Sequence, residues 1–224
     1  MVAFQKMNDV GTGVAWRPVA LATTLSFAGG YVDGNTKQRF DSFGGMQTGN
    51  TVFLGSALES LDGFGVALYL AIILSFMGGV MFTVEVMSRT KRKLAIGFIM
   101  ALNLIGCDAL AAIPYLQAHP NMLRFTCVFA AVSMGSQNAI SMKHEEIQQH
   151  TTIVTGNLQK LTELGWRILH KATGEGDAQQ CSQLGLGWLG YVLGACVGTA
   201  SAAVIGDWSL WPATILQNAV LFLS

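Results

Sequence analysis

Six apolar runs make up most of the chain, and the few charged residues lie between them. The runs cover residues 18–32, 64–86, 94–116, 122–142, 184–205 and 210–223. A helix needs roughly 20 apolar residues to cross a hydrocarbon core, and the first and last runs are short of that. Only 12% of the residues are charged, against about 25% in a soluble domain, and the mean hydropathy is +0.45. The sequence therefore predicts a single integral membrane domain, residues 1–224, folded as an all-α polytopic transmembrane helical bundle.

The charge balance and the reactive residues argue against several other classes of protein. Thirteen Lys and Arg against thirteen Asp and Glu leave no basic surplus, so we expect the lipid bilayer, and no nucleic acid, as a partner. The four cysteines have no Cys-x-x-Cys spacing, and three lie in apolar runs, where a free thiol packs as a small hydrophobe. His144 and His150 are six residues apart, whereas a zinc-binding helix needs four. We expect no enzyme activity, no metal and no cofactor.

Two further segments, residues 48–61 and 153–170, have helical periodicity but are poor candidates for spans. The first has about 14 residues, fewer than the roughly 20 needed. The second contains four ionisable residues, Lys160, Glu163, Arg167 and His170. Such side chains are costly in lipid unless they face protein, water or the membrane interface. Both segments are predicted to be broken, re-entrant or interfacial half-helices.

The distribution of Lys and Arg predicts the orientation, because cytoplasmic loops collect basic residues. With a cytoplasmic N-terminus and half-helices that do not cross, ten basic residues lie inside and three, Lys37, Arg39 and Arg124, lie outside. If the half-helices crossed, the repeats would be parallel, with seven basic residues inside and six outside. The first arrangement gives each half an odd number of spans. Residues of about 15–117 and about 121–224 then form inverted repeats, a recurring build of secondary transporters.

The tripeptide Thr-Gly-Asn opens both short segments and marks the repeat. It occurs at residues 48–50 and 155–157, and each copy follows a Gly-x-x-Asp or Gly-x-x-Asn signal. The spacing from glycine to threonine is 18 residues from Gly30 and 20 residues from Gly135, which indicates a duplication. These signals supply the candidate substrate-binding residues Asp33, Thr48, Gly49, Asn50, Gln137, Asn138, Thr155, Gly156 and Asn157.

The chemistry of these residues leaves two interpretations open. A helix start at membrane depth presents free N–H groups and a positive dipole end, which suit an anion or the negative end of a polar solute. Thr and Asn also cap helices, so the same residues could serve only to satisfy the amides of a broken helix. Asp33 has neutral Asn138 at the matching place in the second half. Its carboxylate is a candidate proton carrier or cation ligand, or a cap at the membrane interface.

Glycines recur at helix-packing intervals. Residues 185–190 fit Gly-x-Gly-x-x-Gly, but no strand precedes them, which argues against a dinucleotide site. Continued through Gly194 and Gly198, the run becomes a ridge that lets membrane helices approach closely. Gly78 and Gly79 are predicted to do the same in the first half. Such ridges could also join copies of the chain in a homo-oligomer.

Four signals in order resemble a known family. Residues 26–33 (Ser-Phe-Ala-Gly-Gly-Tyr-Val-Asp) and 46–55 (Met-Gln-Thr-Gly-Asn-Thr-Val-Phe-Leu-Gly) are similar to a signature of the YoaK-like family, small membrane proteins of unknown function. Residues 135–139 and 152–157 are similar to the second signature of that family. The resemblance covers nearly the whole chain and implies a compact polytopic helical bundle, with no activity attached. The chain departs from the family in a polar insert at residues 34–41, which we expect to protrude into water.

Two functions follow from these observations. The leading hypothesis is a small-solute secondary transporter or permease, with a polar site formed by the two Thr-Gly-Asn half-helices and Asp33, and a small polar or anionic solute as its ligand. The alternative is a non-transporting membrane scaffold or assembly factor whose glycine ridges pack against a partner. A membrane-embedded enzyme is the weakest hypothesis, because no nucleophile, base or metal set is clustered in the sequence.

Overall fold

The computed structural model describes residues 14–90, 93–144, 146–147, 151, 154–172, 174 and 176–223, and every regular element in them is a helix. In chain order these are α2 (Trp16–Phe40), α3 (Gln47–Glu59), α4 (Gly63–Arg89), α5 (Lys93–Ala111), α6 (Pro114–Gln117), α7 (Pro120–Arg124), α8 (Cys127–Lys143), α9 (Val154–Leu169), α10 (Asp177–Ile205), the 3-10 turn η2 (Gly206–Trp208) and α11 (Trp211–Leu223). Lys6, Lys91, Arg92, His150, Thr152 and Ile153, which entered the sequence predictions, lie outside the described residues.

All six apolar runs fall in helices, but the helices differ in their suitability as spans. Among the described residues, three stretches are long and apolar enough to cross a membrane, namely Gly63–Arg89, Leu94–Ala111 and Asp177–Trp208. Helix α2 has 25 residues but carries many polar side chains, whereas α8 has 17 residues and α11 has 13. Three of the six predicted spans thus meet the length and composition of a membrane span, and the other three stay predictions. Helices α3 and α9, predicted to be half-helices, have 13 and 16 residues.

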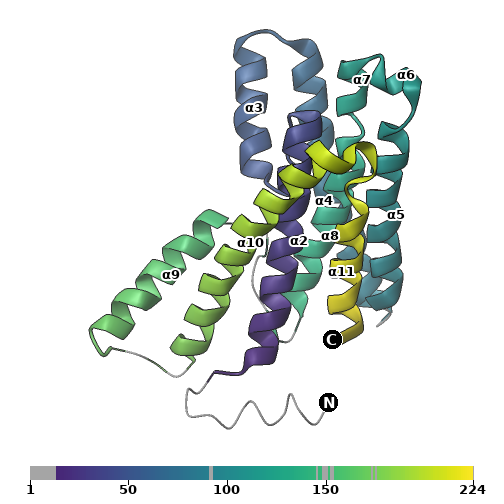
Figure 1. The fold of residues 1–224 in the computed structure, drawn as a ribbon. Helices are drawn as coiled ribbons and strands as arrows, with labels where there is room; N and C mark the ends of the chain where they lie inside the picture. The colour runs from purple at the N-terminus through teal and green to yellow at the C-terminus, as the bar shows by residue number, and fades with distance from the viewer. Residues whose placement is uncertain are drawn as a thin grey trace.

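Two long helix pairs organise the bundle. Helix α2 packs along α10, and α4 packs along α8. Helix α5 then contacts α8 and α11, and α11 also contacts α2, while α3 lies on α4 and α9 lies on α10. Figure 1 shows α3 at the same end as α6 and α7, and α9 at the opposite end, where α2 begins and α11 ends. The two short helices therefore occupy opposite ends of the bundle.

Glycines allow the backbones of α2 and α10 to touch. A methyl group on Gly30 would lie 2.0 Å from the carbonyl oxygen of Tyr191 on α10. A methyl group on Gly194 of α10 would lie 2.0 Å from the carbonyl oxygen of Phe27 on α2. Gly190 and Gly198 of the predicted ridge face α2 in the same way. Only glycine permits helices this close, so the ridge packs inside the chain.

The α4–α8 pair uses the same device. A methyl group on Gly135 of α8 would lie 2.1 Å from the carbonyl oxygen of Phe76, and one on Gly79 of α4 would lie 2.2 Å from that of Val132. The neighbouring Gly78 differs, because no atom lies within 4 Å of the place a methyl group would take. Of the predicted Gly78-Gly79 contact, only Gly79 takes part.

The polar insert at residues 34–41 does not protrude into water, so that prediction was wrong. Residues 34–40 continue α2, and Asn35 and Thr36 are fully buried. Their side chains are matched within the protein, because Asn35 donates to Ser209 Oγ at 2.8 Å and Thr36 Oγ1 accepts from Gly44 N at 3.0 Å. Polar residues can continue a buried helix when each finds a hydrogen-bond partner.

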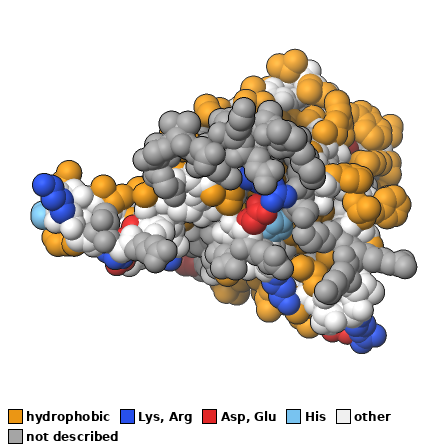
Figure 2. All heavy atoms as spheres, turned by 90° about the horizontal axis from the view of Figure 1, so that it is seen from below, with side chains coloured by type: hydrophobic (Ala, Val, Ile, Leu, Met, Phe, Trp, Pro, Cys, Tyr) orange, Lys and Arg blue, Asp and Glu red, His pale blue; other side chains and the backbone are white. Residues whose placement is uncertain are grey.

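The outer surface of the long helices is apolar. Exposed large side chains include Leu74 and Met81 on α4, Phe98 on α5 and Val204 on α10. Seen from below, at the end where α2 begins and α11 ends, described charged side chains face the viewer and hydrophobic ones line much of the outer margin (Figure 2). An apolar girth with charges at the ends is the distribution that a bilayer favours.

Candidate functional site

Asp33 holds the segment that leads into α3. Its Oδ1 accepts hydrogen bonds from the backbone N–H groups of Gly45 at 2.6 Å and Met46 at 3.2 Å. Its Oδ2 accepts a hydrogen bond from the hydroxyl of Tyr191 on α10 at 2.6 Å. Asp33 is 2% exposed. Its buried carboxylate bonds both to the segment before α3 and to α10, and so links these two parts of the bundle. A carboxylate in this position complements the positive end of α3.

Asn50 and Gly49 shape the turn before α3. The Asn50 side chain accepts from Phe43 N at 3.0 Å and donates to Phe43 O at 2.7 Å and to Gln47 Oε1 at 3.1 Å. It is fully buried. A methyl group on Gly49 would lie 2.7 Å from the Phe43 ring. The donors and the acceptor of Asn50 are thus used within the chain, but they hold the loop at Phe43 and do not cap α3, whose N-cap Met46 has no side-chain cap bond.

The second half holds its polar residues differently. Gln137 donates to Leu25 O at 2.9 Å and to Thr151 Oγ1 at 3.2 Å, and its Oε1 accepts from Gln217 Nε2 at 2.8 Å. It therefore ties α8 to α2, to α11 and to the segment before α9. In the first turn of α9, Thr155 and Gly156 are exposed and Asn157 is half-buried.

The starts of α3 and α9 meet at one pocket of about 360 Å³. It is lined by Gly45, Met46, Gln47, Thr48, Gly49, Val52, Phe76, Asn138, Val154 and Thr155. Four of the nine predicted residues, Thr48, Gly49, Asn138 and Thr155, are thus brought together from both halves. Asp33 and Asn50 lie behind the α3 side of the pocket, where Asp33 holds the backbone N–H groups of Gly45 and Met46 and Asn50 donates to the side chain of Gln47. Gln137, Gly156 and Asn157 are not among the lining residues.

The pocket is neutral, with polar and apolar sides. None of the described residues that line it is charged, and its polar side chains are Gln47, Thr48, Asn138 and Thr155. Met46, Val52, Phe76 and Val154 supply apolar surface. Two helix N-termini border the pocket and contribute positive partial charge. The arrangement suits a small solute with a polar or anionic group and an apolar part.

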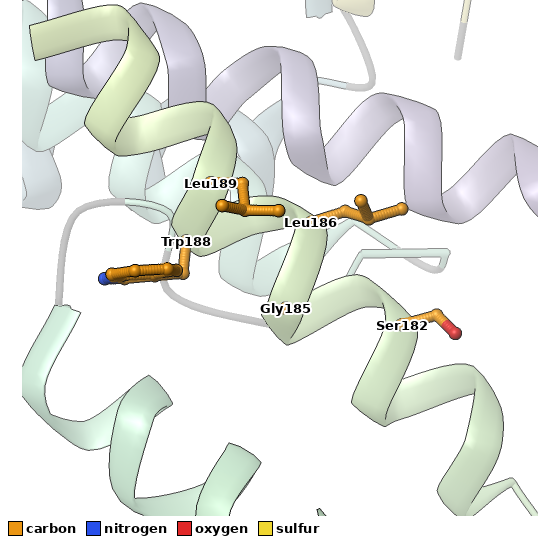
Figure 3. A pocket seen from close by; sticks show the side chains of 5 residues that line it. All are labelled: Ser182, Gly185, Leu186, Trp188 and Leu189. Atoms are coloured by element: carbon orange, nitrogen blue, oxygen red, sulfur yellow. The ribbon is translucent and has the colours of Figure 1, made fainter. Parts of the chain in front are cut away.

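A second pocket, of about 350 Å³, lies along α10 and is lined by Ser182, Gly185, Leu186, Trp188 and Leu189 (Figure 3). All five residues belong to about two turns of one helix. Trp188 and Leu189 are exposed and apolar. Because a single helix lines this pocket and one hydroxyl is its polar side chain, it offers little chemistry for recognition.

Sequence reasoning missed several residues of the site. Tyr191 lies in the glycine ridge, where the signal that could have found it is a hydroxyl between Gly190 and Gly194. Gly45 and Phe76 carry no signature that distinguishes them from packing residues, and Met46 opens the signature at residues 46–55 without a polar group that would single it out. Among the described residues, no group of three or more His, Cys, Asp or Glu side chains could hold a metal ion.

A separate polar network joins α2 to α5 and α11. Arg39 Nη1 donates to Asp108 Oδ1 at 2.6 Å, and the two side chains are 8% and 0% exposed. Arg39 Nη2 donates to Asp207 O at 2.8 Å, and Asp108 Oδ2 accepts from Leu210 N at 2.8 Å. Asp108 therefore faces the interior of the bundle. The network lies away from the pocket residues and fixes helix ends.

The fold and the site define a helical protein whose described part includes three helices suited in length and composition to cross a membrane, with a pocket between the starts of α3 and α9. Over residues 21–223 the chain matches the family described as "Protein of unknown function (DUF1275)", and it belongs to that family. This agrees with the YoaK-like resemblance of the sequence signatures. No curated protein and no solved structure matches the chain.

Proposed function

We propose that this protein is a multi-pass membrane permease that binds a small solute between the starts of α3 and α9. The observation that carries the proposal is the pocket lined by Thr48 of one half and Thr155 of the other. Binding sites in secondary transporters lie at the interface of two repeats, where broken helices point their N-termini at the substrate. The neutral, partly apolar lining favours a small polar or monoanionic solute.

The packing of the helices supports two related halves. Helices α2, α3, α4 and α5 correspond in order to α8, α9, α10 and α11. The contacts exchange partners in the same way: α2 packs on α10 as α8 packs on α4, and α5 packs on α8 as α11 packs on α2. A two-fold relation between the halves accounts for this pattern.

The register of the glycine contacts supports the same relation. Gly30 and Phe27 correspond to Gly135 and Val132, both 105 residues later. Gly79 and Phe76 correspond to Gly194 and Tyr191, both 115 residues later. The contact of Gly30 with the Tyr191 carbonyl is therefore equivalent to that of Gly135 with the Phe76 carbonyl. The contacts of Gly79 with Val132 and of Gly194 with Phe27 are equivalent in the same way, as expected of a duplicated helix pair.

In the proposed topology α2, α4, α5, α8, α10 and α11 cross the bilayer, while α3 and α9 stop partway. Three crossings per half invert the second half relative to the first. The N-terminal end of α2 is then cytoplasmic, because Arg17, Arg89, Lys143 and Arg167 gather at that side by the positive-inside rule.

Accessibility labelling tests this topology. Single cysteines at Glu59, after α3, and at Lys171, after α9, are expected to react with an impermeant thiol reagent from opposite sides of sealed vesicles. Both cysteines are introduced into a protein in which the exposed Cys196 and the half-buried Cys181 have been replaced. Labelling of both positions from the same side would refute the inverted arrangement.

Transport tests the function itself. Purified protein in liposomes is expected to take up at least one member of a panel of labelled short carboxylates, amino acids and polyols. Thr155→Val, which removes a hydroxyl from the pocket, is expected to reduce that uptake. Thr162→Val is the matched control, because the Thr162 hydroxyl on the same helix bonds only to Leu158 O. Equal loss in both variants, or none in either, would remove the site assignment.

The scaffold function has less support. Gly190, Gly194 and Gly198 already pack against α2 within the chain, so the ridge is not available to a partner unless α2 and α10 separate. A homo-oligomer through another surface stays a prediction.

A further inference from the structure

We propose that Asp33 is a proton-binding site whose charge state sets the position of the pocket wall at Gly45 and Met46. This deepens the proposed permease function, on which its role in transport rests, by naming the proton as coupling ion. The contacts of Asp33 carry the inference, because one buried carboxylate joins α10 of the second half to residues that line the pocket.

The surroundings of Asp33 provide donors but no counter-cation. None of the ion pairs among the described residues includes Asp33. Of the helices packed against α2, α10 presents the Tyr191 phenol, α8 presents the Cys127 thiol, and α11 has no charged residue. Arg124 of α7 is held by Phe40 O at 3.0 Å.

The two basic residues that follow Asp33 on α2 are also committed elsewhere. Arg39 bonds to Asp108 and Asp207, and Lys37 pairs with Asp41. A buried carboxylate without an ionic partner changes charge more readily than one in an ion pair. Protonation is therefore an available response of this site.

The ligand of Asp33 is a proton and not a metal cation. A metal ion needs oxygen ligands with free lone pairs, whereas the described hydrogen-bond partners of Asp33 are two N–H groups and a hydroxyl that all point their hydrogens at it. A proton fits this geometry. A hydronium ion in the water that enters the pocket gives up the proton and becomes water, and the new O–H bond forms at Oδ2. The Tyr191 oxygen can accept a hydrogen bond from the acid, since a phenol oxygen both donates and accepts.

The pocket gives the proton a route. A methyl group on Gly45 would lie 3.1 Å from Asp33 Oδ2, and Gly45 itself lines the pocket. Gly45 therefore lies both beside the carboxylate and at the pocket wall. Water that enters the pocket reaches the neighbourhood of the carboxylate without crossing the packed helix interface.

Protonation of Asp33 weakens the hydrogen bonds that hold Gly45 and Met46, the residues of the pocket wall beside it. The bonds from Gly45 N and Met46 N are charge-assisted while Asp33 is ionised, and such bonds are roughly twice as strong as neutral ones. Once Asp33 is neutral, the segment before α3 is held less firmly. The matching residue Asn138 is neutral at every pH, so the Asp33 carboxylate has no counterpart at the matching position of the second half.

Spin labels at Thr51 on α3 and Thr162 on α9 test the inference, since both residues are exposed. In the full-length protein in lipid nanodiscs, the distance distribution between the labels is expected to change between about pH 8 and about pH 5. Asp33→Asn, which resembles the protonated acid in shape and hydrogen bonding, is expected to show the acidic distribution at both pH values. Asp41→Asn, a change of an exposed carboxylate at the end of α2, is expected to respond like the parent protein.

A distribution that does not change with pH, or an Asp33→Asn variant that still responds, would overturn the inference. If Asp33→Asn fails to fold, Tyr191→Phe decides, because it keeps the carboxylate and removes one donor. If the pH midpoint of the change in spin-label distance is the same in Tyr191→Phe as in the parent protein, the role of the Asp33–Tyr191 pair is refuted. No solute is needed for this measurement, so its failure is distinguishable from failure of the uptake assay.

Discussion

Two adjacent glycines on α4 are expected to respond in opposite ways to the same substitution. Gly79 faces α8, and a methyl group there would lie 2.2 Å from the carbonyl oxygen of Val132. Gly78 faces away, with no atom within 4 Å of the corresponding place. Gly79→Ala and Gly78→Ala therefore add the same atom to the same helix, once into a backbone contact and once into open space.

The magnitudes follow from the contacts. Alanine in place of glycine favours a helix by about 1 kcal/mol, so Gly78→Ala is expected to be neutral or slightly stabilising. In Gly79→Ala the helices must separate by about 1 Å to reach ordinary contact at 3.4 Å. Overpacking typically costs about 1–3 kcal/mol, and a backbone carbonyl cannot rotate aside. The separation also stretches the bond from Ser136 Oγ to Gly79 O, which is already 3.3 Å long.

The expected difference between the two variants is about 2–4 kcal/mol, the overpacking cost plus about one lost hydrogen bond. Unfolding in mixed micelles of increasing SDS content, followed by tryptophan fluorescence, measures this difference. The corresponding change in Tm is roughly 4–16 °C for a chain of this size. Equal stability of the two variants would refute the close approach of α4 and α8.

The same reasoning extends to the second half. Gly194 meets Phe27 O in the way that Gly79 meets Val132 O. Gly194→Ala is therefore expected to cost as much as Gly79→Ala. A large cost at one glycine and none at the other would show that the two helix pairs are not equivalent in packing.

Two further substitutions probe the polar interior by the same unfolding measurement. Asp108→Asn removes the charge that faces buried Arg39 and is expected to lower the free energy of unfolding by about 3–5 kcal/mol. The control Glu85→Gln, in the exposed Glu85–Arg89 pair, is expected to lower it by less than about 1 kcal/mol. Similar losses in the two variants would mean that the Arg39–Asp108 pair is not buried. Asn50→Ala leaves the backbone N–H and C=O of Phe43 without their side-chain partner and is expected to cost about 2 kcal/mol. Thr51→Val is the control and is expected to be close to neutral, because the Thr51 hydroxyl bonds to Gln47 O within α3. An equally neutral Asn50→Ala would contradict the role of Asn50 in holding the loop at Phe43.

The sequence predicted the parts of the fold that depend on local pattern. Apolar runs located the long helices, and Thr-Gly-Asn located the starts of α3 and α9 within about one residue. The glycine ridge predicted close helix packing, because four-residue spacing places those glycines on one helix face. Each of these signals lies within a few neighbouring residues, where helical geometry is fixed.

The partners across the bundle could not be predicted. Asp33 and Tyr191 are 158 residues apart, and Arg39 and Asp108 are 69 apart. Nothing local distinguishes a polar residue that will find such a partner from one that will face water. For that reason residues 34–41 were expected in solvent, although residues 34–40 continue α2 and Asn35 and Thr36 are fully buried.

The site itself depends on a difference between the halves that their shared register reveals. On the proposed pairing, Tyr191 corresponds to Phe76 and Asp33 corresponds to Asn138. At one of the two equivalent places, Asp33 of the first half and Tyr191 of the second bond to each other at 2.6 Å, and Asp33 holds the start of α3. At the other, Asn138 of the second half and Phe76 of the first have no carboxylate and no hydroxyl, and both line the pocket. On the proposed pairing, the pocket therefore has a neutral binding surface opposite a helix start that an acid holds.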